Sequence, residues 1–193
     1  MAEQIAVFLD RDGVINELAY FAGSGEYEAP KTRKDFRIFP HTIGALQELV
    51  KAGCKLFLIT NQPDYAKGKA TMEELKAIHE IMHRKFIENG IEFTEYYYCY
   101  VHPDAVVPEL LGSECRKPKP YMIFEAQKKY NLNLQNAWMV GDQDTDIRTG
   151  KAAGAKTIVV EYPQSANRRG KVAPDFTAKD LKEAVNIILG SSA

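Results

Sequence analysis

Short apolar runs alternate with helical patterns along this chain of 193 residues, and that alternation restricts the folds open to it. Parallel strands need crossover connections, and helices in the crossovers cover both faces of the sheet. The pattern therefore predicts an α/β fold, a three-layer sandwich around a central parallel sheet. The length suits a single domain over residues 1–193. The predicted strands are Ile5–Leu9, Lys55–Thr60, Thr94–Val101, Ala137–Val140 and Lys156–Glu161, and the predicted helices are Thr42–Ala52, Thr71–Asn89, Pro120–Tyr130, Asp144–Ala153 and Asp180–Leu189.

Two segments lack a regular pattern. The stretch from about Asn16 to Pro40 is rich in Gly, Tyr and charge, and its part from Ala19 to Phe36 is expected to be either a flap over a substrate or a solvated loop. The segment after Pro163 is polar and basic, with Arg168-Arg169-Gly170-Lys171. It is expected to be a surface loop before the last helix, although these charges could also hold a second phosphate.

Composition narrows the classes of partner. A net charge of −1 supplies no long-range field toward nucleic acid or an anionic membrane, so neither is expected as a partner. Three cysteines form no disulfide framework and indicate a reducing compartment. The first nine residues lack the pattern of a signal peptide, and no run is long enough to span a bilayer. We expect a cytoplasmic monomer.

Two carboxylates follow the first predicted strand, in Asp10-Arg11-Asp12-Gly13. Ligands of open α/β sheets bind beyond the carboxyl ends of the strands. Residues one position apart on extended backbone project to the same side. Asp10 and Asp12 could therefore face one substrate atom, although a polar turn is the plainer interpretation of this tetrad alone.

Other polar residues follow neighbouring strands and should reach the same sheet edge. Thr60 ends the second strand, Asp142 follows the fourth, and Asp146 lies one helical turn further on. Lys117 enters from the loop before the third helix. Oxygen-rich acidic clusters suit Mg²⁺, and a lysine and a threonine beside the metal suit a phosphoryl group.

The two leading aspartates can divide the chemistry of phosphoryl transfer. Asp10, ionised beside Mg²⁺, can attack phosphorus and form an aspartyl-phosphate that water then hydrolyses. The like charge near Asp12 is expected to raise its pKa, so that Asp12 can protonate the leaving oxygen and then act as base toward water. The two groups are expected to titrate as a coupled pair.

These segments together resemble the haloacid dehalogenase (HAD) superfamily phosphatases, from about Ile5 to Tyr162. The four motifs that carry the resemblance are Asp10 to Asn16, Thr60-Asn61-Gln62, Arg116 to Pro120, and Gly141-Asp142 through Asp146. They are most similar to subfamily III, the branch that holds heptose bisphosphate and histidinol-phosphate phosphatases. The resemblance implies a Rossmann-like core without a large cap domain.

The resemblance also implies roles for single residues. Asp10 would be the nucleophile and Asp12 the acid/base, with Thr60 and Lys117 stabilising the phosphoryl group. Mg²⁺ would be held by Asp10, the Asp12 carbonyl and Asp142, with Asp146 nearby. The residues expected to bind substrate are Arg11, Asn61, Gln62, Arg116 and Gln143.

Two departures from the branch bear on metal and specificity. Relatives often carry a zinc site written Cys-x-His and Cys-x-Cys, but here Val101 and Ser113 replace two ligands and His102 is displaced by one residue. Structural zinc needs four ligands, so no zinc is expected and Cys99 and Cys115 are interpreted as remnants. Pro63-Asp64 stands where many relatives have Ser-Gly, and Lys67 where they often have Arg.

The leading hypothesis is a Mg²⁺-dependent phosphomonoesterase acting on a small sugar (bis)phosphate, with a D-glycero-D-manno-heptose 1,7-bisphosphate as the expected type of substrate. A histidinol-phosphate phosphatase is the main alternative. A nucleic-acid 3′-phosphatase is disfavoured because the chain has no long basic stripe. A non-catalytic sensor of phosphorylated ligands is also disfavoured, because every catalytic position is filled.

Overall fold

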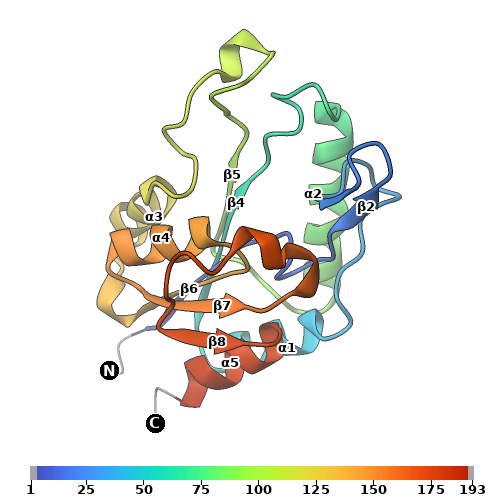
Figure 1. Ribbon diagram of the computed structural model, residues 1–193. Helices are drawn as coiled ribbons and strands as arrows, with labels where there is room; N and C mark the ends of the chain where they lie inside the picture. The colour runs from blue at the N-terminus through green and yellow to red at the C-terminus, as the bar shows by residue number, and fades with distance from the viewer. Residues whose placement is uncertain (1–3, 191–193) are drawn as a thin grey trace.

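The computed structural model describes residues 4–190, and its centre is one parallel sheet of six strands (Figure 1). The spatial order is β5 (Glu95–Cys99), β4 (Lys55–Asn61), β1 (Ala6–Leu9), β6 (Ala137–Gly141), β7 (Lys156–Val160) and β8 (Phe176–Ala178). Each neighbouring pair is parallel. The predicted α/β class is confirmed.

β1 lies inside the sheet, between β4 and β6, and its side chains alternate between the two faces. Val7 and Leu9 pack into the apolar cluster on one face, and Ala6 and Phe8 into the cluster on the other. Because both faces are covered, the strand is a continuous apolar run.

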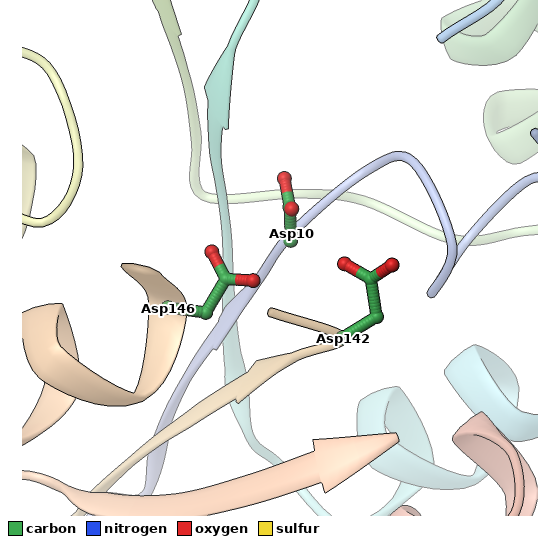
Figure 2. A group of neighbouring side chains, drawn as sticks. All are labelled: Asp10, Asp142 and Asp146. Atoms are coloured by element: carbon green, nitrogen blue, oxygen red, sulfur yellow. The ribbon is translucent and has the colours of Figure 1, made fainter. Parts of the chain in front are cut away.

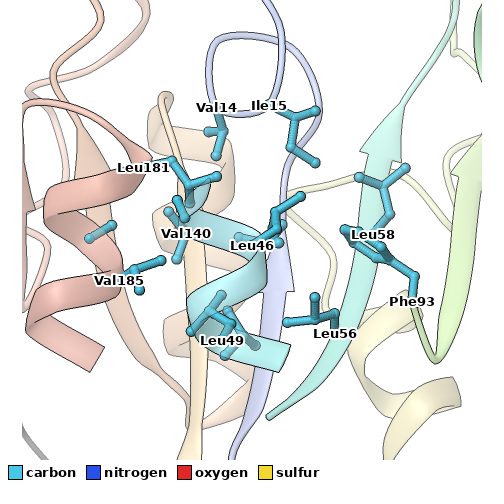
Figure 3. Packing of buried hydrophobic residues seen from close by; sticks show 14 of the residues in the cluster. Val14, Ile15, Leu46, Leu49, Leu56, Leu58, Phe93, Val140, Leu181 and Val185 are labelled. Carbon is cyan, nitrogen blue, oxygen red and sulfur yellow. The ribbon is translucent and has the colours of Figure 1, made fainter. Parts of the chain in front are cut away.

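Helices form the outer layers. α1 (Thr42–Lys51), α2 (Met72–Glu88) and α5 (Leu181–Gly190) cover one face, and α3 (Tyr121–Tyr130) and α4 (Asp144–Ala153) cover the other. Figure 3 shows the first of these layers, where Leu46 and Leu49 of α1 and Leu181 of α5 pack over Val140 of β6. No helix within residues 4–190 is long and apolar enough to cross a membrane.

Three short strands were not expected from the sequence. β2 (Ala19–Phe21) and β3 (Glu26–Glu28) form an antiparallel hairpin within the stretch predicted to be irregular, and β8 lies in the segment predicted to be a loop. Each has three residues, and all of these except Ala178 are partly or largely exposed, so no buried alternation marks them. The 3₁₀ turns η1 (Pro108–Leu110), η2 (Leu134–Asn136) and η3 (Pro163–Arg168) were also not predicted.

One predicted helix start forms only in part. The Thr71 hydroxyl accepts a hydrogen bond from the Glu74 main-chain N–H at 3.2 Å, as a capping box requires. The Glu74 carboxylate, however, pairs with Arg33 at 2.8 Å instead of returning to the helix start. Arg33 thus fastens the long loop after β3 to the N-terminus of α2.

Cys99 and Cys115 form a disulfide, so the expectation that no cysteines pair was wrong. Cys99 ends β5 and Cys115 lies in the loop ahead of α3, 16 residues further along the chain. The fold returns that loop to the end of β5, which spacing along the sequence does not reveal. Cys54 is the free cysteine among the described residues.

Candidate active site

Three buried carboxylates meet at the carboxyl edge of the sheet (Figure 2). Asp10 follows β1, Asp142 follows β6, and Asp146 lies in the first turn of α4. One oxygen of each lies within 4.8 Å of the others. The Asp10 N–H bonds the Val140 carbonyl at 2.9 Å and so extends the β1–β6 pairing to the first carboxylate.

Two glycines make this close approach possible. Gly13 has a φ of +85°, and a Cβ there would lie 2.2 Å from an Asp142 carboxylate oxygen. A Cβ on Gly141 would lie 2.1 Å from the Cβ of Asp146. No other residue type fits these positions without displacing a carboxylate.

Lys117 supplies the positive charge inside the cluster. Its Nζ lies 2.9 Å from Asp10 Oδ1 and 2.6 Å from Asp146 Oδ1. Burial alone would lower the pKa of Lys117, but the two aspartates outweigh it and hold that pKa above its usual value. Lys117 is therefore a permanently charged ammonium between two carboxylates.

The remaining negative charge fits a divalent cation. Burial raises the pKa of Asp10 to about 6, against the attraction of Lys117. Burial, followed by repulsion from Asp146 and Asp10, raises the pKa of Asp142 well above its usual value. Neither carboxylate oxygen of Asp142 has a hydrogen-bond partner among the described residues. Three carboxylates share one ammonium, so negative charge is in excess when all three are ionised. Because carboxylate oxygens are hard ligands, Mg²⁺ is a suitable cation to balance that charge.

Asp12 lies beside this cluster and is held by three side chains. Arg11 donates to both Asp12 carboxylate oxygens, at 2.9 and 3.1 Å from Nη2. Asn16 donates to Oδ1 at 2.9 Å, and Gln62 donates to Oδ2 at 2.7 Å. Arg11 and Gln62, which the sequence predicts to bind substrate, are almost fully buried and are not among the residues that line the cavity.

The end of β4 connects the remaining motif residues. Thr60 is buried, and its hydroxyl accepts a hydrogen bond from Gln62 at 3.1 Å. The Asn61 side chain accepts from the Lys117 N–H at 3.0 Å and donates to the Lys117 carbonyl at 3.2 Å. Asn61 thereby fixes the backbone of the loop that brings Lys117 to Asp10.

A polar cavity opens above Asp10 and Asp12. Three of the residues predicted to bind substrate, Asn61, Arg116 and Gln143, line it, and so do Pro63, Asp64 and Lys67. Cavity residues that sequence reasoning did not identify are Leu18, Glu28, Ala29, Lys69, Thr145 and Arg168. Two signals were available for these residues. The loop that contains Glu28 and Ala29 was expected to be either a flap or a solvated loop, and a solvated loop was the favoured interpretation of the basic run at Arg168.

Lys67 and Arg116 both line the cavity wall, and neither forms a salt bridge within residues 4–190, although the charges of Asp64 and Asp104 attract Lys67. Burial, then the positive charge of Arg116, lowers the pKa of Lys67. Burial also lowers the pKa of Arg116, whose Nη1 has no hydrogen-bond partner among the described residues. By contrast, Lys69 is paired with Glu28 at 2.9 Å. The Lys67–Arg116 pair is therefore free to bind an anion.

The β2–β3 hairpin forms part of the cavity mouth. Its last residue, Glu28, pairs with Lys69, and the carbonyl of Tyr27 accepts a hydrogen bond from Arg168 of η3. Asp144 of α4 accepts N–H groups of residues 170–172 at 3.0–3.2 Å. The mouth is thus made by segments from both ends of the chain.

The remnant zinc segment lies outside this cavity. Cys99 and Cys115 bond to each other, and His102 Nδ1 accepts the Asp104 N–H at 3.0 Å. Within residues 4–190, the carboxylate cluster at Asp10 is the one group of three or more potential metal ligands.

Comparisons with known proteins agree with this geometry. The HAD-hydrolase-like family model matches residues 114–184. A D-glycero-beta-D-manno-heptose-1,7-bisphosphate 7-phosphatase of Yersinia pestis is 31% identical over 180 residues, 92% of each chain. A D-glycero-alpha-D-manno-heptose-1,7-bisphosphate 7-phosphatase of Photorhabdus laumondii is 33% identical over 148 residues, 76% of each chain.

A solved structure extends the similarity to three dimensions. The D,D-heptose 1,7-bisphosphate phosphatase of B. bronchiseptica, complexed with magnesium and phosphate, superposes with a TM-score of 0.81. It is 25% identical, and the match covers 97% of this chain and 99% of that one.

Proposed function

Because this chain belongs to the D-glycero-D-manno-heptose-1,7-bisphosphate 7-phosphatase family of HAD-like hydrolases, we propose that it removes one phosphate from a heptose 1,7-bisphosphate. It is a Mg²⁺-dependent phosphoric monoester hydrolase of the HAD type. The observation that carries the proposal is the buried cluster of Asp10, Asp142 and Asp146 around Lys117, which matches what phosphoryl transfer requires.

In the first step, a carboxylate oxygen of Asp10 attacks the phosphorus atom. The bond between phosphorus and the sugar oxygen breaks, and that oxygen takes a proton from Asp12. The product sugar leaves, and Asp10 carries the phosphoryl group. Lys117, 2.9 Å from Asp10, lies where it can stabilise the phosphoryl oxygens, and Thr60 is proposed to act with it.

In the second step, water attacks the phosphorus atom of the aspartyl-phosphate. Asp12, now ionised, takes a proton from that water while the bond between phosphorus and Asp10 breaks. Inorganic phosphate leaves, and Asp10 is regenerated. The residues proposed to hold Mg²⁺ are Asp10, the Asp12 carbonyl and Asp142, with Asp146 close by. The bound ion supplies positive charge to the phosphoryl oxygens.

The second phosphate of the substrate is assigned to Lys67 and Arg116. Two neighbouring cations without a carboxylate partner suit a dianionic group, and Arg116 has an unsatisfied donor. This pairing favours a bisphosphate over histidinol phosphate, which has one phosphate. The relatives include enzymes named for the alpha and the beta anomer, so the anomer is left to experiment.

The proposal extends to the chain as a whole. Two apolar clusters on the faces of one sheet support a single catalytic domain over residues 1–193. A cytoplasmic, monomeric protein without a nucleic-acid partner remains our prediction.

A panel of phosphomonoesters tests the function. Phosphate release is measured with Mg²⁺ on both heptose 1,7-bisphosphate anomers, fructose 1,6-bisphosphate, histidinol phosphate and 3′-phosphorylated DNA. We expect the highest kcat/KM on a heptose bisphosphate, with the 7-phosphate removed as judged by phosphorus NMR. Asp10→Asn should lower kcat by roughly 10³-fold or more, because no other nucleophile is in place.

Asp35→Asn is the control and should retain activity. The Asp35 carboxylate accepts a hydrogen bond from Thr32 and does not line the cavity. If kcat/KM is tenfold higher on histidinol phosphate than on either heptose bisphosphate, the protein is a histidinol-phosphate phosphatase and the proposed substrate is wrong. No turnover of any compound would leave a sensor of phosphorylated ligands as the better explanation.

A further inference from the structure

Arg11 separates the two aspartates of the first motif, and we propose that it is a positioning residue for the reaction. Its guanidinium holds the Asp12 carboxylate in the orientation from which Asp12 exchanges protons with the leaving group and with water. The inference rests on the proposed function, because Asp12 has this task only in phosphoryl transfer.

The contact between Arg11 and Asp12 is multiple and buried. Arg11 Nε lies 3.1 Å from Oδ1, and Nη2 lies 2.9 Å from Oδ1 and 3.1 Å from Oδ2. The Arg11 side chain is 0% exposed. A planar fork against a carboxylate restrains rotation of that carboxylate, which a single point charge does not.

The donors are distributed unevenly between the two oxygens of Asp12. Oδ1 accepts from Arg11 Nε, Arg11 Nη2 and Asn16, which exceeds its two lone pairs. Oδ2 accepts from Gln62 at 2.7 Å and from Nη2 at a longer distance. Arg11 therefore contacts both oxygens and holds the plane of the Asp12 carboxylate, with Asn16 and Gln62 bonded to one oxygen each.

The charge of Arg11 acts on a group of uncharged aromatic side chains, His79, Tyr98 and Tyr100. His79 of α2 stacks on Tyr98 of β5 with ring centroids 3.8 Å apart. Burial, and then the charge of Arg11, lowers the pKa of His79 to about 3, so this ring is neutral. Asp12 is the only carboxylate paired with Arg11 within residues 4–190. No competing anion draws the guanidinium away.

Removing Arg11 would leave Asp12 with two neutral amide donors, Asn16 and Gln62. The carboxylate could then rotate about its own side chain. We expect the substitution to slow the two events in which Asp12 moves a proton, which are protonation of the leaving oxygen and deprotonation of the attacking water. The attack of Asp10 on phosphorus itself moves no proton. With a leaving group that departs without a proton, formation of the aspartyl-phosphate does not need Asp12, whereas its hydrolysis still does.

The experiment compares p-nitrophenyl phosphate with an alkyl phosphate in Mg²⁺, with rapid mixing and acid quench. With p-nitrophenyl phosphate, Arg11→Gln should form the aspartyl-phosphate within about threefold of the wild-type rate. Hydrolysis of the aspartyl-phosphate should slow by about 10- to 100-fold in this variant, so the phosphorylated enzyme accumulates. With the alkyl phosphate, both steps should slow. Arg11→Lys should recover part of the loss, because it restores the charge without the fork.

Leu46→Ala is the matched control, because it removes buried volume from α1 and touches neither aspartate. It should lower Tm without changing the balance of the two steps. If Arg11→Gln slows both steps with p-nitrophenyl phosphate by the same factor, or slows neither, the positioning role is wrong. If the wild-type enzyme forms no aspartyl-phosphate with either compound, the proposed function itself fails.

Discussion

Lys67 and Lys69 are two positions apart and line the same cavity, but their charges are balanced differently. Lys69 has Glu28 at 2.9 Å, whereas Lys67 faces Arg116. An ammonium that already has a carboxylate partner gains less from an incoming phosphate than one beside another cation. This contrast offers a matched pair of substitutions on one surface.

We predict that Lys67→Met raises KM for a heptose bisphosphate by about 10- to 100-fold, the loss of roughly 1.4–3 kcal/mol from one charge-assisted contact. The effect on the matching monophosphate should be threefold or less, because that substrate has nothing to place at Lys67. Steady-state kinetics on both substrates measures the difference.

Lys69→Met is the control and should change both KM values by a similar, smaller factor. An equal loss on bisphosphate and monophosphate for Lys67→Met would mean that the second phosphate binds elsewhere.

Single residues differ in how far sequence could place them. Asp10 and Asp142 were predicted to meet because each follows the carboxyl end of a strand, a rule that depends only on a parallel sheet, and Asp146 because it lies one helical turn after Asp142. The contact of Arg11 with Asp12 could not be predicted, because a side chain beside a turn can point to solvent or to the core. The cavity role of Arg168 depends on a long-range return of the chain.

At the scale of elements, the disulfide joins β5 to the loop that carries Lys117. The Cys99 carbonyl also accepts the Gln62 N–H at 2.7 Å, so β4, β5 and that loop meet at one place. In the chain-entropy model, a disulfide that closes a loop of about this length raises the free energy of unfolding by about 3 kcal/mol, because it lowers the entropy of the unfolded chain.

We predict one titratable thiol in the oxidised, denatured protein and three after reduction, because Cys54 is free and the other two are paired. A thiol reagent in denaturant measures both counts. Reduction should also lower Tm, and Cys54→Ser should remove the single thiol of the oxidised form. Three thiols in carefully unreduced protein would contradict the pairing.

The elements that sequence could predict are those with a repeated burial pattern. The central strands and the five helices were recovered within a few residues, because each repeats a buried face several times. β2, β3 and β8 were missed because three residues make less than two periods of alternation, and β8 lies at a sheet edge. Their pairing is decided by tertiary contacts.

For the whole molecule, the carboxylate cluster links stability to pH and to metal. In the metal-free protein the pKa of Asp10 is about 6, above its ordinary 3.8. The folded chain therefore binds more protons than the unfolded chain between these values. The stability that Asp10 contributes is complete below its ordinary pKa and is lost as pH rises through about 6. Mg²⁺ must displace those protons in order to bind.

We predict that Mg²⁺ raises Tm more at pH 7.5 than at pH 5. At a concentration 100 times Kd, the ion stabilises the fold by about 2.7 kcal/mol, or roughly 5–10 °C for a chain of this size. One unit below the pKa of Asp10, affinity falls about tenfold and the gain is about halved. Thermal unfolding with and without Mg²⁺ at both pH values measures this.

Asp142→Asn should abolish most of the Mg²⁺ effect, and the exposed Asp104→Asn should retain it. An equal rise in Tm at both pH values would show that no proton is exchanged for the metal.

The strand order also decides when, during synthesis, the protein can first act. β1 is made first yet lies between β4 and β6, so its second neighbour is missing until the ribosome has passed residue 141. Asp142 and Asp146 come only after about three quarters of the chain. A nascent chain holds Asp10 and Asp12 long before it can complete the carboxylate cluster. The carboxylate cluster therefore cannot be complete before the β6–α4 segment has been synthesised.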